Sequence, residues 1–150
     1  MAKAIPEGMH SVIPCLSIDG AAEAIEFYKK ALGAEEITRA VDPSGKKVWH
    51  AALRINGSTL FLSDTFPEMG GAANKSKVWL YMDKVDQAWK RATEAGGQVK
   101  MPLADMFWGD RMGTLVDRWG NEWTLAQHTK DLTPEEMKKA QDAFIASMKK

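Results

Sequence analysis

The sequence predicts an α+β fold in which two βαβββ modules pair around a concave mixed sheet, followed by a C-terminal helix. The first observation is an internal repeat. Residues 19–33 and 83–97 have the same length, and each carries an apolar stripe at helical spacing. The second is that extended, alternating runs flank each of these helices. The third is a capping box at Thr133 and Glu136 with Pro134 at the first helical position, which predicts a final helix.

The first module is predicted over about residues 11–64. Its predicted strands cover residues 11–18, 35–41, 47–56 and 58–64. Pro14 cannot donate to a ladder and therefore indicates an edge or an interruption in the first strand. Asp19 is the predicted N-cap of the helix, and Gly33 is expected to end it. Asn56 and Gly57 predict a tight turn between the last two strands.

A linker rich in glycine, alanine and asparagine, residues 65–76, separates this module from a second one over about residues 77–128. The predicted elements of the second module are a strand at 78–82, a helix at 85–95, a run at 98–103 and a hairpin at 112–116 and 122–127. Asp83 is its predicted N-cap, and Gly57 aligns with Gly120 after a one-residue adjustment. With the final helix at about 133–149, the whole chain of 150 residues is expected to form one domain.

Alternation assigns the strand residues to two faces. Trp123 and Leu125 are predicted to face the core, and Thr124 faces the opposite, cup side. In the run 47–56 the predicted helix-facing residues are Trp49, Ala51, Leu53 and Ile55, and the predicted cup-facing residues are Val48, His50, Ala52 and Arg54. The functional interpretation depends on the cup side, because the helix side is expected to be core.

Composition excludes several classes of function. The sequence has 20 lysines plus arginines and 20 aspartates plus glutamates. It shows no basic stripe with interleaved aromatic residues, which argues against nucleic acid as a partner. The single cysteine, Cys15, favours a reducing cytoplasm. The first residues lack the apolar run of a signal peptide, and no stretch is expected to span a membrane. Six tryptophans favour either a dense core or a pocket with aromatic walls.

Several residues are candidates for a ligand site on the cup side. His50 is a candidate acid/base or ligand contact, and the competing interpretation is a hydrogen-bonded structural histidine. Trp79 and Tyr81 are candidates for stacking on a flat ligand, or else for packing between the modules. Trp108 and Arg111 suit the rim of a pocket, although Arg111 pairing with its neighbour Asp110 to orient a turn is equally consistent with the pattern.

The chain resembles the vicinal oxygen chelate superfamily, which includes glyoxalase I, extradiol dioxygenases and bleomycin-resistance proteins. The resemblance is carried by SIDGAAEAIEFYKKALGAE, NGSTLFLSD and WGDRMGTLVDRWGNEWTLAQH followed by DLTPEEM, and it runs from about residue 11 to residue 137. Within the superfamily it looks most like the PhnB-like branch. This resemblance implies paired βαβββ modules, a homodimer and a small molecule as partner.

Members of the superfamily that use a metal place His or Glu ligands on the first and last strands of each module. In this sequence the resemblance places the corresponding positions at Ile13, Phe61, Lys77 and Thr124. A catalytic divalent metal needs about three histidine or carboxylate ligands, and none of these four residues supplies one. Glu122 and His128 lie about 20 Å apart on one strand, so they are not expected to share an ion. We therefore expect neither a cofactor nor a metal.

Three functions remain open at this point. The leading one is a metal-free protein that binds a small apolar or aromatic molecule in the cup. The expected contact residues are His50, Phe61, Trp79, Tyr81, Trp108, Arg111 and Thr124. The second is a glyoxalase-like lyase or isomerase that uses a displaced metal or His50. The third is an interaction module that binds a protein through the cup or the last helix. The apolar stripe on that helix also favours a homodimer.

Overall fold

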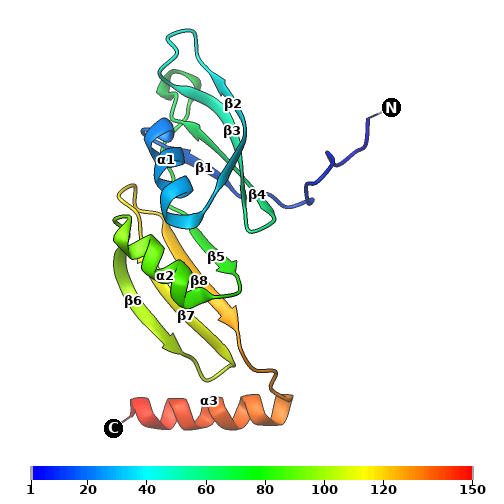
Figure 1. Cartoon of the computed structure of the whole chain (residues 1–150), viewed down its shortest axis with the longest axis vertical. Helices are drawn as coiled ribbons and strands as arrows, with labels where there is room; N and C mark the ends of the chain where they lie inside the picture. The colour runs from blue at the N-terminus through cyan, green and yellow to red at the C-terminus, as the bar shows by residue number, and fades with distance from the viewer. Residues whose placement is uncertain (1, 150) are drawn as a thin grey trace.

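The computed structural model describes residues 2–149 and arranges their strands in two four-stranded mixed sheets, which Figure 1 shows end to end. The elements are β1 Cys15–Ile18, α1 Ala21–Leu32, β2 Glu35–Val41, β3 Val48–Ile55, β4 Ser58–Asp64, a short 3₁₀ helix Pro67–Met69, β5 Lys77–Tyr81, α2 Val85–Glu94, β6 Gln98–Asp105, β7 Asp110–Val116, β8 Glu122–His128 and α3 Pro134–Met148. Sheet A has the order β1-β4-β3-β2, and sheet B has the order β5-β8-β7-β6. In both, the first strand runs parallel to the last. The predicted fold class is confirmed.

The predicted N-caps are wrong in both modules, and for the same physical reason. The N-cap residues are Gly20 and Lys84, both in the left-handed conformation and without a side-chain cap. The free amides are satisfied from the end of the last strand instead. The Asp64 carboxylate accepts from the N–H groups of Gly20 and Ala21. The Gln127 side chain accepts from the N–H of Val85. A long-range contact thus replaces the local cap that the sequence suggested.

The hydrophobic core of residues 2–149 draws on both modules, and α1 packs against α2. Tyr28 of α1 is fully buried, and its ring lies 4.9 Å from that of Trp123 on β8. Its hydroxyl donates to Asp117 Oδ2 at 2.6 Å, in the turn between β7 and β8. That turn joins the two strands of the predicted hairpin: Asp117 accepts from the backbone N–H groups of Trp119 and Asn121, and Gly120 has φ +87°.

The predicted faces of β3 hold from Ala51 onward but fail at its start. The register with β2 skips from the pair Ala40–His50 to the pair Val41–Val48, which leaves Trp49 as the extra residue of a β-bulge. Val48 therefore faces the core and is fully buried, and Trp49 is exposed and stacks on Phe66 at 4.4 Å. His50 keeps its predicted side, because the bulge restores the alternation after Trp49.

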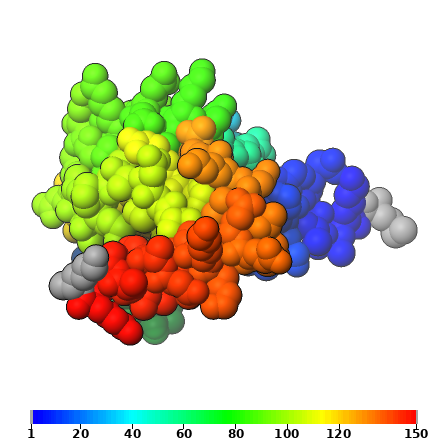
Figure 2. All heavy atoms as spheres, turned by 90° about the horizontal axis from the view of Figure 1, so that it is seen from below, coloured from blue at the N-terminus to red at the C-terminus, as the bar shows by residue number. Residues whose placement is uncertain are grey.

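The two ends of the described chain lie outside the paired modules. Residues before β1 form an arm that projects from the body in Figures 1 and 2. The first strand is shorter than predicted because Pro14 contributes only its carbonyl, which accepts from the N–H of Phe61. Helix α3 lies below sheet B and has the predicted capping box. None of its residues is buried, and Phe144 contacts Phe107 at 5.1 Å between ring centroids.

Candidate functional site

Each sheet has one face toward the helices and one face free of them, which we call its open face. On the open face of sheet A, Phe61 lies beside Cys15 on β1 and Ala52 on β3. The His50 ring meets the Phe61 ring edge-on, with 4.6 Å between centroids. Within the described residues His50 makes no side-chain hydrogen bond, and it is exposed. The structure therefore brings His50 and Phe61 together on this face.

The open face of sheet B carries two half-exposed aromatic side chains. Trp79 and Tyr81 are 46% and 54% exposed, and their rings lie 6.1 Å apart at an angle of 49°. Thr124 pairs with Trp79 across the β5–β8 ladder and shares a 2.8 Å hydroxyl hydrogen bond with Thr114. Two inclined aromatic planes next to a strand that carries a hydroxyl can hold a flat molecule by stacking.

A buried carboxylate lies behind Tyr81. Asp110, at the start of β7, is 2% exposed, and it accepts from the Tyr81 hydroxyl at 2.7 Å and from Trp108 Nε1 at 3.0 Å. His128 Nδ1 lies 2.8 Å from its other oxygen, and His128 Nε2 lies 2.8 Å from Asp131. These five residues form the Asp110 cluster.

The hydrogen bonds of the Asp110 cluster set the protonation of its members. Burial opposes ionisation of Asp110, but the hydrogen bonds from His128, Tyr81 and Trp108 outweigh it and lower the pKa of Asp110. The same contact with Asp110, followed by that with Asp131, raises the pKa of His128. The hydrogen bond to Asp110 also raises the pKa of Tyr81. Near neutral pH the carboxylate is ionised and the phenol keeps its proton.

Sequence reasoning missed the Asp110 cluster, although a signal for it was present. The predicted hairpin pairs Val116 with Glu122. Extending that register outward by six residues on each strand brings Asp110 opposite His128, which is the observed pair. The predicted strands stopped too early at both outer ends, so the pair was not recognised.

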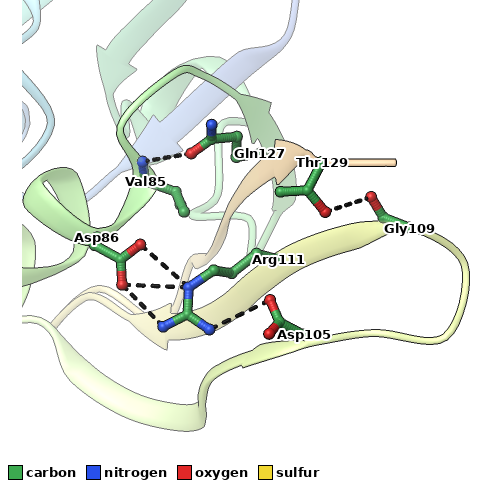
Figure 3. Close-up of polar contacts among 7 residues, drawn as sticks. All are labelled: Val85, Asp86, Asp105, Gly109, Arg111, Gln127 and Thr129. Carbon is green, nitrogen blue, oxygen red and sulfur yellow. Dashed lines mark hydrogen bonds and ion pairs between the residues drawn. The ribbon is translucent and has the colours of Figure 1, made fainter. Parts of the chain in front are cut away.

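Arg111 lies on the helix-facing side of sheet B, as Figure 3 shows. Its guanidinium contacts Asp86 of α2 at 2.8 Å and Asp105 of β6 at 3.4 Å. The hydrogen bond from Arg111 lowers the pKa of Asp86. The same figure shows Val85 bonded to Gln127 and Thr129 bonded to Gly109. Arg111 therefore ties α2 to the sheet and does not share a face with Trp79, Tyr81 and Thr124.

Residues of β4, of the arm and of β5 come together at a seam between the two sheets. A cavity of about 260 Å³ lies there, between Ile13 on the arm, Thr59 on β4 and Trp79 on β5. Asn56 Nδ2 donates to the Tyr81 carbonyl across the same seam at 2.7 Å. Trp79 thus borders both the open face of sheet B and the seam.

The four positions that correspond to metal ligands in the superfamily do not form a metal site. Ile13 and Phe61 have no donor atoms, and Lys77 lies 3.7 Å from Glu122 in an ion pair. Glu122 also contacts Lys100, so a dication there would meet two ammonium groups. Among residues 2–149, no group of three or more histidine, cysteine, aspartate or glutamate side chains is placed to hold an ion. The donor set does not fit a catalytic metal.

Two βαβββ modules, each with its helix on one sheet face and the other face open, define a protein of the vicinal oxygen chelate type. The family model of the Glyoxalase/Bleomycin resistance protein/Dioxygenase superfamily matches residues 10–125, so the chain belongs to this superfamily.

Comparison with individual proteins agrees with this assignment. The uncharacterized protein Rv0887c of Mycobacterium tuberculosis (strain ATCC 25618 / H37Rv) is 39% identical over 136 residues, which cover 85% of this chain and 79% of that protein. The crystal structure of TioX from Micromonospora sp. ML1 matches with a TM-score of 0.68 at 24% identity, over 79% of this chain and 98% of TioX. TnmS3 from Streptomyces sp. CB03234, described as an antibiotic binding protein, matches with a TM-score of 0.63 at 24% identity, over 85% of this chain and 100% of TnmS3. The two structures show a shared fold.

The helices of residues 2–149 include none that is long and apolar enough to cross a membrane.

Proposed function

We propose that this protein binds a small apolar or aromatic molecule against the open sheet faces, without a metal and without transforming it. The observation that carries the proposal is the pair Trp79 and Tyr81, two large aromatic side chains left half-exposed on one sheet face. Exposed aromatic surface of this kind is costly in water unless a partner covers it. The fold shared with TnmS3, described as an antibiotic binding protein, supports the same class of function.

The proposed contact residues follow from the geometry. Trp79, Tyr81 and Thr124 supply the wall on sheet B, and His50 and Phe61 supply a second contact surface on sheet A. Trp108 acts through its hydrogen bond to Asp110. Arg111 is omitted because its side chain binds Asp86 and Asp105 on the other face.

We also propose that the protein is a homodimer of the PhnB-like branch that works in the cytoplasm. A dimer is supported by α3, whose apolar residues Ala140, Phe144 and Met148 lie on a helix with no buried residue. The branch is supported by the motifs around Trp108 and Thr133. The reducing compartment is supported by Cys15, an unpaired thiol.

The alternative function is catalysis with His50 as acid/base. Its support is that His50 is exposed on an open face and makes no side-chain hydrogen bond within residues 2–149. A glyoxalase-like isomerase would need such a group beside its substrate.

The test begins with protein purified from cells under native conditions, whose bound small molecules are identified by mass spectrometry and whose metal content is measured by elemental analysis. Trp79→Ala should weaken the affinity for an identified ligand by about 1 kcal/mol or more if stacking matters. Trp49→Ala is the matched control, because Trp49 is similarly exposed but stacks on Phe66 and not beside Tyr81. If folded Trp79→Ala protein binds the ligand as tightly as the wild type, the proposed contact surface on sheet B is refuted.

The absence of a metal is tested on the same protein. We expect no stoichiometric zinc, nickel or manganese, either as purified or after titration. Stoichiometric metal that disappears on Thr124→Ala or Lys77→Ala would overturn the metal-free proposal. Turnover of a bound molecule that disappears on His50→Ala would establish the enzymatic alternative.

A further inference from the structure

We infer that the molecule held by Trp79 and Tyr81 is recognised as a hydrogen-bond donor: a flat ring whose edge carries a hydroxyl, amine or ring N–H that donates to the Tyr81 oxygen. The inference rests on the proposed function and narrows its ligand class. It is carried by the Asp110 cluster, whose internal hydrogen bonds determine which donor and acceptor groups stay available to a ligand.

The direction of the Tyr81 hydrogen bond is fixed by its partner. An ionised aspartate has no proton to give, so at 2.7 Å the Tyr81 hydroxyl must donate to Asp110. A phenol has one proton and two lone pairs. With the proton committed to Asp110, the hydroxyl oxygen of the half-exposed Tyr81 has only lone pairs left to offer a ligand. Tyr81 is therefore a hydrogen-bond acceptor for any ligand.

The other members of the cluster offer no free donor to a ligand, because their N–H groups already bond to carboxylates. The indole N–H of Trp108 donates to the same Asp110 oxygen at 3.0 Å. Both ring nitrogens of His128 lie at 2.8 Å from carboxylates, Asp110 on one side and Asp131 on the other. Two carboxylates face one imidazole, so the cluster carries no net positive charge that would attract an anion.

The position of Trp79 makes this acceptor reachable by a stacked ring. The two aromatic rings are 6.1 Å apart and inclined by 49°, and they project from the same face of β5 two residues apart. A ring lying on Trp79 therefore directs one edge toward Tyr81. A donor on that edge gains a hydrogen bond, whereas a carboxylate there meets an acceptor and the Asp110 charge behind it.

Three naphthalenes that differ at one position test the inference on the full-length protein: 2-naphthol, which donates; 2-methoxynaphthalene, which only accepts; and 2-naphthoate, which is an anion. Binding is measured by calorimetry or by NMR titration. We expect 2-naphthol to bind about fivefold more tightly than 2-methoxynaphthalene, the size of one net hydrogen bond, and 2-naphthoate to bind most weakly.

Tyr81→Phe should remove the preference for 2-naphthol and leave the affinity for 2-methoxynaphthalene unchanged, because the ring remains. Trp79→Ala should weaken all three probes, and Trp49→Ala should weaken none. Circular dichroism confirms that each variant is folded. Equal binding of 2-naphthol and 2-methoxynaphthalene, with both weakened by Trp79→Ala, would overturn the donor preference while the proposed function stands. No binding of any of the three would overturn both.

Discussion

Tyr28→Phe tests how the two modules are joined. The variant removes one oxygen atom and keeps the ring that packs on Trp123. In the native protein this hydroxyl donates to Asp117 at 2.6 Å, and both residues are buried. Burial, followed by the charge of Asp117, raises the pKa of Tyr28, so the phenol is a donor at any ordinary pH. The bond links α1 of the first module to the β7–β8 turn of the second.

The expected loss in the free energy of unfolding follows from the hydrogen bonds that Asp117 keeps in the Tyr28→Phe variant. Asp117 Oδ2 keeps the hydrogen bond from Trp123 Nε1 at 2.9 Å, and Oδ1 keeps two backbone donors. The loss is therefore one hydrogen bond to a buried carboxylate, which is worth about 1.5–3 kcal/mol. With a urea m-value of about 2 kcal/mol/M, the midpoint should fall by about 1 M.

The assay is urea denaturation followed by tryptophan fluorescence and circular dichroism. Tyr81→Phe is the matched control, since it also removes a phenol hydroxyl from a buried aspartate. There the ring is half-exposed, water can replace the hydroxyl, and we expect a loss below about 1 kcal/mol. Equal losses in the two variants would refute the reasoning. Two separate transitions in the wild type would also refute it, because a shared core predicts that both modules unfold together.

Three further predictions concern the lower end of sheet B and the helix α3 below it. Gly109→Ala should destabilise the protein by about 2 kcal/mol or more in urea denaturation, because Gly109 has φ +96° and an added Cβ would overlap the Lys130 carbonyl oxygen. The raised pKa of His128 means that its hydrogen bonds stabilise the fold fully below its unfolded pKa of about 6.5 and less as pH rises through the folded value. His128→Asn should therefore lower the urea midpoint more at pH 5.5 than at pH 8.5. Light scattering at micromolar concentration should give about twice the chain mass of 16.6 kDa, and Met148→Lys should shift the protein toward monomer.

Each of these three has its own control or refuting result. Gly45→Ala shares the positive φ of Gly109 but meets no atom within 4 Å. It should therefore cost less than Gly109→Ala, and an equal cost would mean that the contact with Lys130 does not matter. A His128→Asn effect that grows with pH would reverse the sign argued above. A molar mass of one chain for the wild-type protein would contradict the dimer proposal.

Much of the fold could be predicted because its signals are local. The helical stripes of α1 and α2, the Asn56–Gly57 turn and the capping box at Thr133 each depend on neighbours within four residues. The N-caps could not be predicted in this way, because Asp64 and Gln127 reach the helix starts from strands that end more than forty residues away. Trp49 was misassigned because a β-bulge moves one residue out of the alternation without a local sign such as glycine.

The site was harder to predict than the fold because its polar contacts join separate strands. Tyr81, Asp110 and His128 come from β5, β7 and β8, and each alone reads as an ordinary strand residue. Arg111 was a candidate because it follows Trp108 and Asp110 in the chain. Successive residues of a strand point to opposite faces, so sequence proximity to Asp110 in fact places Arg111 on the other side of the sheet.

The repeat explains why sheet B, more than sheet A, is suited to hold a ring. The two ladders place Cys15 beside Phe61 in one module and Trp79 beside Thr124 in the other. Each open face thus carries one large aromatic and one small side chain at equivalent places, but in exchanged order. In sheet A the aromatic lies on β4, between two strands, and it is partly covered. In sheet B it lies on the edge strand β5, where no further strand covers it. Because an edge position leaves an aromatic plane accessible from the side, this exchange exposes Trp79, and the Asp110 cluster then fixes the adjacent Tyr81 hydroxyl as an acceptor.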